Sequence, residues 1–417
     1  MQTNCFLEKL KKYNVLSHPD KTLYRHIIEI RKITNLLTNE LLNNNQFAQK
    51  KISDFLNDLM HFHDIGKVHY LFQSYLEENN KSIKYSHSLQ SFFIYLIEKY
   101  KELKERNELD NYNLIIKYLI IALLILSHHS SLKSLNELKN KLKEIDFNII
   151  MDIYQILRLS INKEEVNEAV EFWKEKIEEF EESEIGFFEE NLFNIDIEDY
   201  LIILFAFGIF LFADRLSAFI TEDWKDEKDL EKIIKKLFEE LRINKAYSRI
   251  SYKKFQEFIK NLQEKSSKNK INELRTQAFK EVEENFEKNK DKKIFKITLP
   301  TGLGKTLTGL NIALKLNNEL SRPIIYSLPY LSIIEQNYQV IKNIFNNRKE
   351  EVVGKFHHLT IFNENEEKTN LRDFINFELK PITVTTFIQI FHSIFTNDRN
   401  WIIKFPFIAT SILIIDE

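Results

Sequence analysis

Leucine, isoleucine, glutamate and lysine dominate the first three hundred residues, and few helix-breaking residues interrupt them. No proline occurs between Pro19 and Pro300, and only three glycines lie between them. Because the abundant residue types favour helices and the rare ones end them, the pattern predicts an almost wholly helical region. Its two strongest apolar runs, 119–126 and 201–213, are too short to span a bilayer and are predicted to be buried helices.

The pattern changes near residue 294, where short apolar runs rich in β-branched residues begin to alternate with helical stretches. The short runs are 294–299, 323–328, 382–386 and 411–415, and the helical stretches include 305–320 and 333–345. Apolar strands that alternate with helices are typical of an α/β domain with a parallel sheet.

These patterns predict a multidomain chain. An all-α domain is expected at 1–225 and an α/β domain at 272–417. Residues 226–271 are helical in pattern and highly charged, and they form either a linker or a helical extension of one neighbour. A length of 417 residues is sufficient for two or three domains.

Composition and charge limit the kinds of protein that this chain is expected to be. The net charge of −3 carries no global nucleic-acid signal, so any such binding depends on local basic patches. The single cysteine, Cys5, excludes an internal disulfide and a cysteine-based zinc site, and it fits a reducing cytoplasm. The first twelve residues are polar and charged, so no signal peptide is expected. We predict a cytoplasmic protein without a membrane segment.

Candidate metal ligands are concentrated near the N-terminus, where eight of the 11 histidines lie in the first 129 residues. The adjacent pair His63-Asp64 offers an imidazole and a carboxylate, whose two oxygens are able to bridge two ions. The doublet His128-His129 and the carboxylate of Asp214 each follow an apolar run, where a solvated side chain has no packing role. Imidazole-rich sites favour Mn, Fe, Co, Ni or Zn over Mg.

Each of these residues also has an ordinary structural explanation. An isolated histidine such as His26 or His87 is most often a surface or hydrogen-bonded residue, and Asp214 has Arg215 beside it as an ion-pair partner. Lys67 resembles any surface lysine when it is taken alone. The set as a whole is far more specific than any single member.

A phosphate-binding loop follows at residues 299–306. Gly302 and Gly304 allow the backbone to turn its N–H groups toward phosphates, Lys305 supplies a positive charge, and Thr306 offers a hydroxyl to Mg²⁺. The loop departs from the general pattern at Leu299, but from Pro300 and Thr301 onward it matches the helicase form in full. We therefore predict a site for ATP and Mg²⁺.

Other segments follow one another along the chain in the same order as the motifs of superfamily 2 helicases. Gln277 either reads adenine or is a surface glutamine, and residues 326–337 and 383–386 resemble segments that contact a DNA backbone. Asp416 and Glu417 resemble the start of the Asp-Glu box, in which the first residue binds Mg²⁺ and the second polarises the attacking water. The doublet His357-His358 lies far along the chain from the other histidines and is interpreted as structural.

The order of a histidine, a His-Asp pair and a distal aspartate resembles the HD phosphohydrolase superfamily. Together with the helicase motifs, the chain resembles the CRISPR-associated nuclease–helicase of type I systems. This resemblance implies two metal ions, with Asp64 shared between their ligand sets. The first set would be His26, His63, Asp64 and Asp214, and the second Asp64, His87, His128 and His129. His18 is an alternative to His26, and His61 and His69 match no ligand position.

The resemblance also implies a function. It is a metal-dependent single-stranded DNA nuclease joined to the first RecA-like domain of an ATP-dependent helicase. Asp64 would be central to catalysis, and Lys67 would meet a substrate phosphate or support the site. The implied partners are single-stranded DNA and the CRISPR surveillance complex, Cascade, at an R-loop.

The sequence ends inside the Asp-Glu box, before a second RecA-like domain with its arginine, so it is expected to be a natural fragment, a split gene product or a truncated form of a longer chain. A separate chain is one expected source of that domain. Two other functions remain open. One is an HD hydrolase of nucleotides or cyclic nucleotides, and the other is a regulatory DNA-binding protein with an inactive motor.

Overall fold

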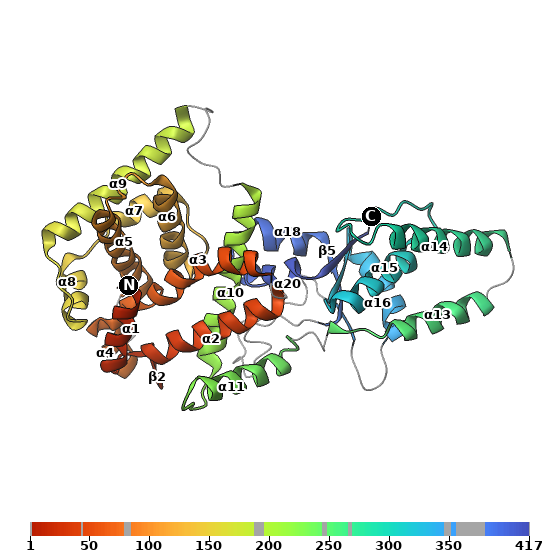
Figure 1. The fold of residues 1–417 in the computed structure, drawn as a ribbon, viewed down its shortest axis with the longest axis horizontal. Coiled ribbons are helices and arrows are strands. Elements are labelled where there is room, and N and C mark those ends of the chain that lie inside the picture. The colour runs from red at the N-terminus through yellow and green to blue at the C-terminus, as the bar shows by residue number, and fades with distance from the viewer. Residues whose placement is uncertain are drawn as a thin grey trace. The chain divides into compact units, whose positions relative to one another are not determined.

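The computed structural model describes residues 2–42, 45–78, 85–186, 196–243, 248–265, 269–345, 352–355 and 380–416. The chain forms two compact units, which are coloured along the sequence in Figure 1. The first consists of Met1–Ile233 and Ile394–Pro406, and the second of Ile234–Ser393 and Phe407–Glu417. The helical unit is thus larger than the predicted segment 1–225, and it includes a short segment that the sequence pattern placed in the other domain.

The first unit is helical, as the scarcity of proline and glycine predicted. Its helices are α1 (Gln2–Lys12), α2 (Leu23–Leu42), α3 (Gln46–Phe62), α4 (Tyr70–Glu78), α5 (His87–Arg106), α6 (Tyr112–Ser127), α7 (Leu135–Leu142), α8 (Phe147–Ile156), α9 (Lys163–Gly186), α10 (Ile197–Phe219) and α19 (Arg399–Ile402). A 3₁₀ turn, η1 (Ile65–Val68), follows α3, and β1 (Leu16–His18) pairs antiparallel with β2 (Lys21–Thr22). Helix α11 (Glu227–Glu240) runs across the boundary between the units.

Helix α10 packs against α2 and α3 (Figure 1). It contains the apolar run 201–213, and its aromatic side chains Phe207, Phe210 and Phe212 are fully buried. The helix is longer than the run: its 23 residues are long and apolar enough to cross a membrane, but 67% of the most apolar window is buried inside the protein. This burial agrees with the buried helix that the sequence predicted.

The second unit contains a four-stranded sheet with the order β4-β5-β3-β6. The strands β3 (Ile324–Leu328), β4 (Val353–Lys355), β5 (Ile382–Thr386) and β6 (Ile412–Ile415) are all parallel, so three predicted strands and the parallel sheet are confirmed. The helices of this unit are α13 (Tyr252–Lys265), α14 (Lys270–Lys288), α15 (Lys305–Leu320), α16 (Leu331–Phe345), α18 (Phe387–Phe395) and α20 (Phe405–Ala409), the last two of which reach into the 394–406 segment.

The predicted linker contributes to this second unit. Ile250 and Phe255 are buried in the same core as Ile324, Tyr326 and Val384 of the sheet. Of the two possibilities for residues 226–271, the structure therefore favours a helical extension over a free linker.

The predicted strand at 294–299 is wrong. Its residues form no strand, and the side chain of Ile294 is 91% exposed. An apolar β-branched run becomes a strand only where a neighbouring strand supplies hydrogen bonds, and no described strand pairs with this one. The phosphate-binding loop therefore opens a helix, as predicted, but does not follow a sheet strand.

Candidate functional site

All seven predicted metal ligands lie in the helical unit, and they come from five separate helices or helix ends. His26 lies on α2, and Asp214 lies on α10. His63 is the C-terminal cap of α3, and Asp64 follows it at the start of η1. The remaining ligands are His87 at the first position of α5, His128 at the end of α6, and His129 after it.

Gly66 allows two of these elements to approach closely. A Cβ atom at this position would lie 2.2 Å from the carbonyl oxygen of His87, so only glycine fits beneath the first turn of α5. Its N–H also donates to the hydroxyl of Ser91, at 2.9 Å. This contact places His87 next to the His63-Asp64 pair.

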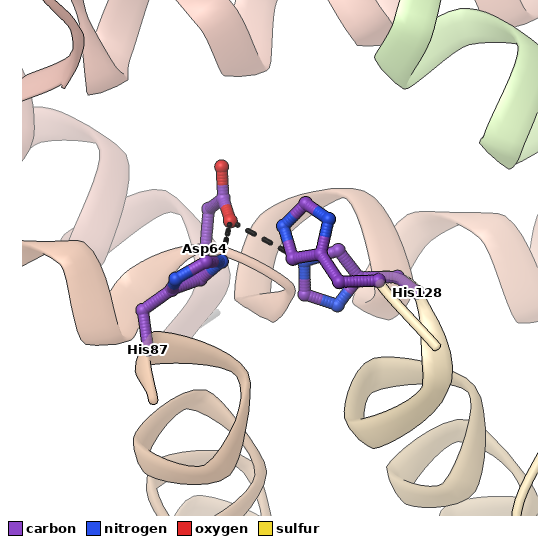
Figure 2. A group of neighbouring side chains, drawn as sticks. Asp64, His87 and His128 are labelled. Atoms are coloured by element: carbon purple, nitrogen blue, oxygen red, sulfur yellow. Dashed lines mark ion pairs between the residues drawn. The ribbon is translucent and has the colours of Figure 1, made fainter. Parts of the chain in front are cut away.

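The first group of converging side chains consists of Asp64, His87, His128 and His129, and their candidate ligand atoms all lie within 4.8 Å of one another. Oδ1 of Asp64 is 3.3 Å from Nε2 of His87 and 3.5 Å from Nε2 of His128. Figure 2 shows the labelled side chains pointing toward one another from different elements. We call this set the His128 group.

The second group consists of His26, His63 and Asp214, within the same limit of 4.8 Å. Nε2 of His26 lies 3.2 Å from Oδ1 of Asp214, and Nε2 of His63 lies 3.9 Å from the same oxygen. Oδ2 of Asp64 is 3.4 Å from both of these imidazole nitrogens. Asp64 therefore lies between this His26 group and the His128 group, with one oxygen toward each.

The donor set fits divalent metal ions. The Nε2 atoms of His26, His63, His87 and His128 and both carboxylate oxygens of Asp64 are buried, and their only close polar contacts among the described residues are with one another, with Asp214 and with the ammonium group of Lys67. Buried polar atoms without partners are costly and are rare in proteins unless a ligand satisfies them. Imidazole and carboxylate donors together are suited to divalent transition metals.

The other ring nitrogens hold these imidazoles in place. Nδ1 of His63 lies 3.1 Å from the carbonyl oxygen of Met60, and Nδ1 of His128 lies 2.6 Å from that of Ile125. A carbonyl accepts only from an N–H, so Nε2 is the unprotonated nitrogen and faces the centre. Nδ1 of His26 lies 2.8 Å from the hydroxyl of Ser217, which itself donates to Glu29.

Charges in the centre are set by burial and by close partners. Burial lowers the pKa of His63, and it lowers the pKa of His87 to about 4, so both imidazoles are neutral near pH 7. Burial alone would raise the pKa of Asp64, but Lys67 and His63 hold it well below its usual range. Burial opposes protonation of His26 as well, yet the hydrogen bond to Asp214 raises its pKa. Burial would likewise raise the pKa of Asp214, but the hydrogen bond with His26 holds it below its usual range, so two anionic carboxylates face mainly neutral imidazoles.

Several residues lie near the centre without belonging to either group. The ring of His18 is 5.0 Å from that of His26, and of the two only His26 belongs to a group of candidate ligand atoms within 4.8 Å of one another. His61 contacts the carbonyl of Asn57, and His69 lies 3.5 Å from Asp152. Ser217 was not among the predicted residues, although it follows Asp214 by three residues and hence lies on the same helix face.

The predicted phosphate-binding loop opens helix α15. Gly302 and Gly304 both have a φ of +84°, which other residues rarely adopt, and no atom lies within 4 Å of where a Cβ would stand on either. Gly304 is the N-terminal cap of α15, and Lys305 and Thr306 form its first turn. The guanidinium of Arg275 donates to the carbonyl oxygen of Gly302 at 2.8 Å. The loop is open and faces the positive end of a helix, as an anion site requires.

Asp416 lies directly after β6, beside the carboxyl end of β3. Its N–H donates to the carbonyl oxygen of Ser327 at 3.0 Å, and its carboxylate accepts from the hydroxyl of Tyr326. The same hydroxyl interacts with Thr306, and burial raises the pKa of Tyr326, so it stays protonated. Thr306 of the loop and Asp416 of the Asp-Glu box are therefore joined through one tyrosine.

The remaining predicted residues lie on the surface, in a strand or outside the described part of the chain. Gln277 is exposed on α14, and its amide donates to Glu281 at 2.8 Å. Thr301 is exposed in the loop. Glu417, His357 and His358 lie outside the described residues. Residues 383–386 form most of strand β5, where Val384, Thr385 and Thr386 are buried.

Sequence comparisons with known proteins match parts of the chain. Residues 255–417 match the family "Type III restriction enzyme, res subunit". The chain is 31% identical over 142 residues to the CRISPR-associated nuclease/helicase Cas3 of Haloferax volcanii, a match that covers 29% of this chain and 15% of that relative. The sequence match thus covers a small part of the relative's own length.

Matches to solved structures cover a larger share of this chain. The crystal structure of T. fusca Cas3-ADP has a TM-score of 0.51 at 15% identity, and that of T. fusca Cas3-ATP has a TM-score of 0.50 at 14%. Each match covers 95% of this chain and 45% of the solved chain, so this chain spans less than half of those proteins. At these identities the comparison shows the fold alone. In partial sequence similarity and in fold, the chain resembles the nuclease/helicase Cas3, as its motifs predicted.

Proposed function

We propose that this chain is a metal-dependent nuclease for single-stranded DNA, joined to an ATP-binding motor domain of helicase type, and that it acts in CRISPR interference. The observation that best supports the nuclease activity is the position of Asp64 between two groups of buried imidazole and carboxylate side chains that are able to act as metal ligands. The similarity to Cas3 and the match of residues 255–417 support the motor.

Two ions are proposed. His26, His63 and Asp214, together with the nearby Oδ2 of Asp64, would hold one, and Asp64, His87, His128 and His129 the other. Mn, Fe, Co or Ni suits these donors, and bound ions of this kind activate water and neutralise the oxygens of a phosphodiester.

The side chains of this centre are already in the protonation states that metal binding requires. Neutral His63 and His87 present lone pairs without first losing a proton, and the low pKa of Asp64 keeps both of its oxygens ionised. Lys67 balances that charge from a buried position.

The motor half is proposed from the open loop and its neighbours. Lys305 and the loop N–H groups would bind the phosphates of ATP, and Thr306 and Asp416 would hold Mg²⁺. The likeness to Cas3 structures named for ATP and ADP supports this nucleotide. Recruitment by Cascade at an R-loop, adenine contact by Gln277 and water polarisation by Glu417 belong to the same proposal.

The test is a cleavage assay on circular single-stranded DNA with Mn²⁺, Co²⁺, Ni²⁺, Mg²⁺ or a chelator, with and without ATP. Cleavage with transition metals is expected without ATP, because all proposed ligands lie in the helical unit. If metal binds but no DNA is cut under any of these conditions, the proposed nuclease is wrong.

A second assay under matched conditions tests the alternative reaction, hydrolysis of a small nucleotide. An HD hydrolase of small molecules would use the same two groups, so a cyclic nucleotide is offered under the same conditions. Faster hydrolysis of the cyclic nucleotide than of DNA would favour that function instead.

A further inference from the structure

Residues 394–406 belong to the compact helical unit, although in sequence they lie between β5 and β6 of the second unit. They contain the short helix α19, whose N-terminal cap Asp398 accepts from the N–H of Asn400 at 2.8 Å. This segment contacts two of the elements that carry metal-ligand candidates.

The first contact is with the loop that carries the histidine doublet. The guanidinium of Arg399 donates to the carbonyl oxygen of His128, at 3.1 Å. Three residues after His129, the N–H of Leu132 donates to the carbonyl oxygen of Asn397, at 2.8 Å. The segment therefore holds the backbone on both sides of His129. His128 ends helix α6, where carbonyl groups have no partner within the helix, so Arg399 satisfies one of them.

The second contact is with α10, the helix that carries Asp214. The side-chain oxygen of Asn400 accepts from Arg215 at 2.7 Å, and the hydroxyl of Tyr200 donates to the carbonyl of Ile394. At Gly208, a Cβ would lie 2.7 Å from the carbonyl oxygen of Ile402 and 2.6 Å from the ring of Pro406. Only glycine permits so close an approach.

We propose that residues 394–406 are a positioning element of the metal centre and that Arg399 orients the His128-His129 peptide for the ion of the His128 group. The inference rests on the proposed two-metal site. Rotation of that peptide would turn both imidazoles, and the hydrogen bond to its carbonyl opposes the rotation. The nuclease would thus depend on residues that lie within the motor sequence.

The test uses the full chain with Arg399→Gln and titrates Mn²⁺ by calorimetry. In a His26→Ala background, where the His128 group dominates binding, Arg399→Gln is expected to weaken Mn²⁺ binding about 10-fold, as loss of an outer partner of a metal ligand commonly does. In a His87→Ala background, where the His26 group dominates, the change should stay below about twofold.

A measurement without metal distinguishes a positioning role of Arg399 from an effect of its charge. Amide hydrogen exchange of residues 128–133 should rise in Arg399→Gln without any ion, while exchange in the core of α5 stays unchanged. Arg399→Lys keeps a donor and the charge, so it should lose less affinity than the glutamine variant. Arg106→Gln is the matched control: this arginine of the same unit pairs with Glu102 at 2.8 Å, and its side chain is 56% exposed.

Gly208→Ala provides a second route, because its methyl group would push the segment away from α10. It should produce the same selective loss in the His128 group and the same rise in exchange. Wild-type binding of two ions, with equal binding and unchanged exchange in Arg399→Gln and Gly208→Ala, would overturn this inference alone. A wild-type chain that binds no Mn²⁺ would instead overturn the proposed function.

Discussion

The ammonium group of Lys67 lies 2.7 Å from Oδ2 of Asp64, and both side chains are buried. The tight turn η1 brings these residues, three apart in sequence, onto one side. The sequence offered three roles for Lys67: a surface lysine, a phosphate contact or a support of the site. Burial excludes the first, and the ion pair shows the supporting contact directly. The same pair contributes to the low pKa of Asp64.

Lys67→Met should destabilise the metal-free protein. It leaves the buried carboxylate of Asp64 without its cation, and breaking a buried pair from one side costs about 3–5 kcal/mol. Thermal melting in EDTA should therefore occur at a lower temperature, and Mn²⁺ should restore most of the loss. Lys51→Met is the control, since Lys51 forms an exposed pair with Glu198 at 3.3 Å. A variant that melts like the wild type in EDTA would contradict the role assigned to this pair.

Asp64→Asn should abolish cleavage of single-stranded DNA. One of its oxygens faces each ligand group, so the substitution weakens both ions at once, and we expect a loss of more than about 100-fold. The measurement is the initial cleavage rate with Mn²⁺, alongside elemental analysis of bound metal. Asp152→Asn removes a carboxylate that pairs with His69 outside both groups and should cut normally. Cleavage by Asp64→Asn at the wild-type rate would rule out the proposed site.

His128→Ala and His129→Ala should lose one ion and keep the other. Both residues belong to the His128 group, whereas His26, His63 and Asp214 remain in place. Elemental analysis after reconstitution should fall from two ions to about one per chain, with loss of nuclease activity. If the doublet served only packing, the variants would melt at a lower temperature and still bind two ions.

The metal-free protein should lose stability as the pH falls from 7 to 5. Burial lowers the pKa of His18 to about 3 and of His87 to about 4, and it lowers that of His63, while the unfolded chain has histidines near 6.5. The unfolded state therefore binds more protons below pH 6.5, and each such group lowers the free energy of unfolding by about 1.4 kcal/mol per pH unit.

His26 acts in the opposite direction, because its pKa is raised and its contribution is lost as the pH rises. His18, His63 and His87 outweigh it in the window from pH 6.5 to about 4, and His61, His69 and His129, whose pKa values burial also lowers, act in the same direction as these three. Denaturant titration in EDTA at pH 7 and pH 5 measures the difference. Equal or greater stability at pH 5 would show that these imidazoles are already protonated in the folded protein.

Lys305→Ala should remove nucleotide binding without affecting the metal centre. Lys305 begins α15 at the open loop, where it adds the positive charge that the phosphates require. Binding of a fluorescent ATP analogue with Mg²⁺ should disappear, while Mn²⁺ binding to the helical unit stays unchanged. Lys253→Ala changes an 85% exposed lysine of the same unit and should bind nucleotide normally. Full nucleotide affinity in Lys305→Ala would place the site elsewhere.

Local patterns predicted much of the architecture and many of the candidate residues. Helix content, the buried run in α10 and three parallel strands depend on short-range composition and periodicity, which a sequence displays directly. The unpaired run 294–299 has the same composition as a strand and is not one. Composition shows that a run is able to pair, but only the positions of other strands decide whether it does.

The sequence by itself determined the residue types of the site: imidazoles and carboxylates near the N-terminus, and a glycine-rich loop before a helix. Tertiary structure alone decided how they meet. Asp64 lies between two groups because five helices converge, Lys67 pairs with it because the turn is buried, and Arg399 reaches His128 from 271 residues away. Such contacts depend on long-range packing and on the cost of unpaired buried polar atoms, neither of which leaves a local signal in the sequence.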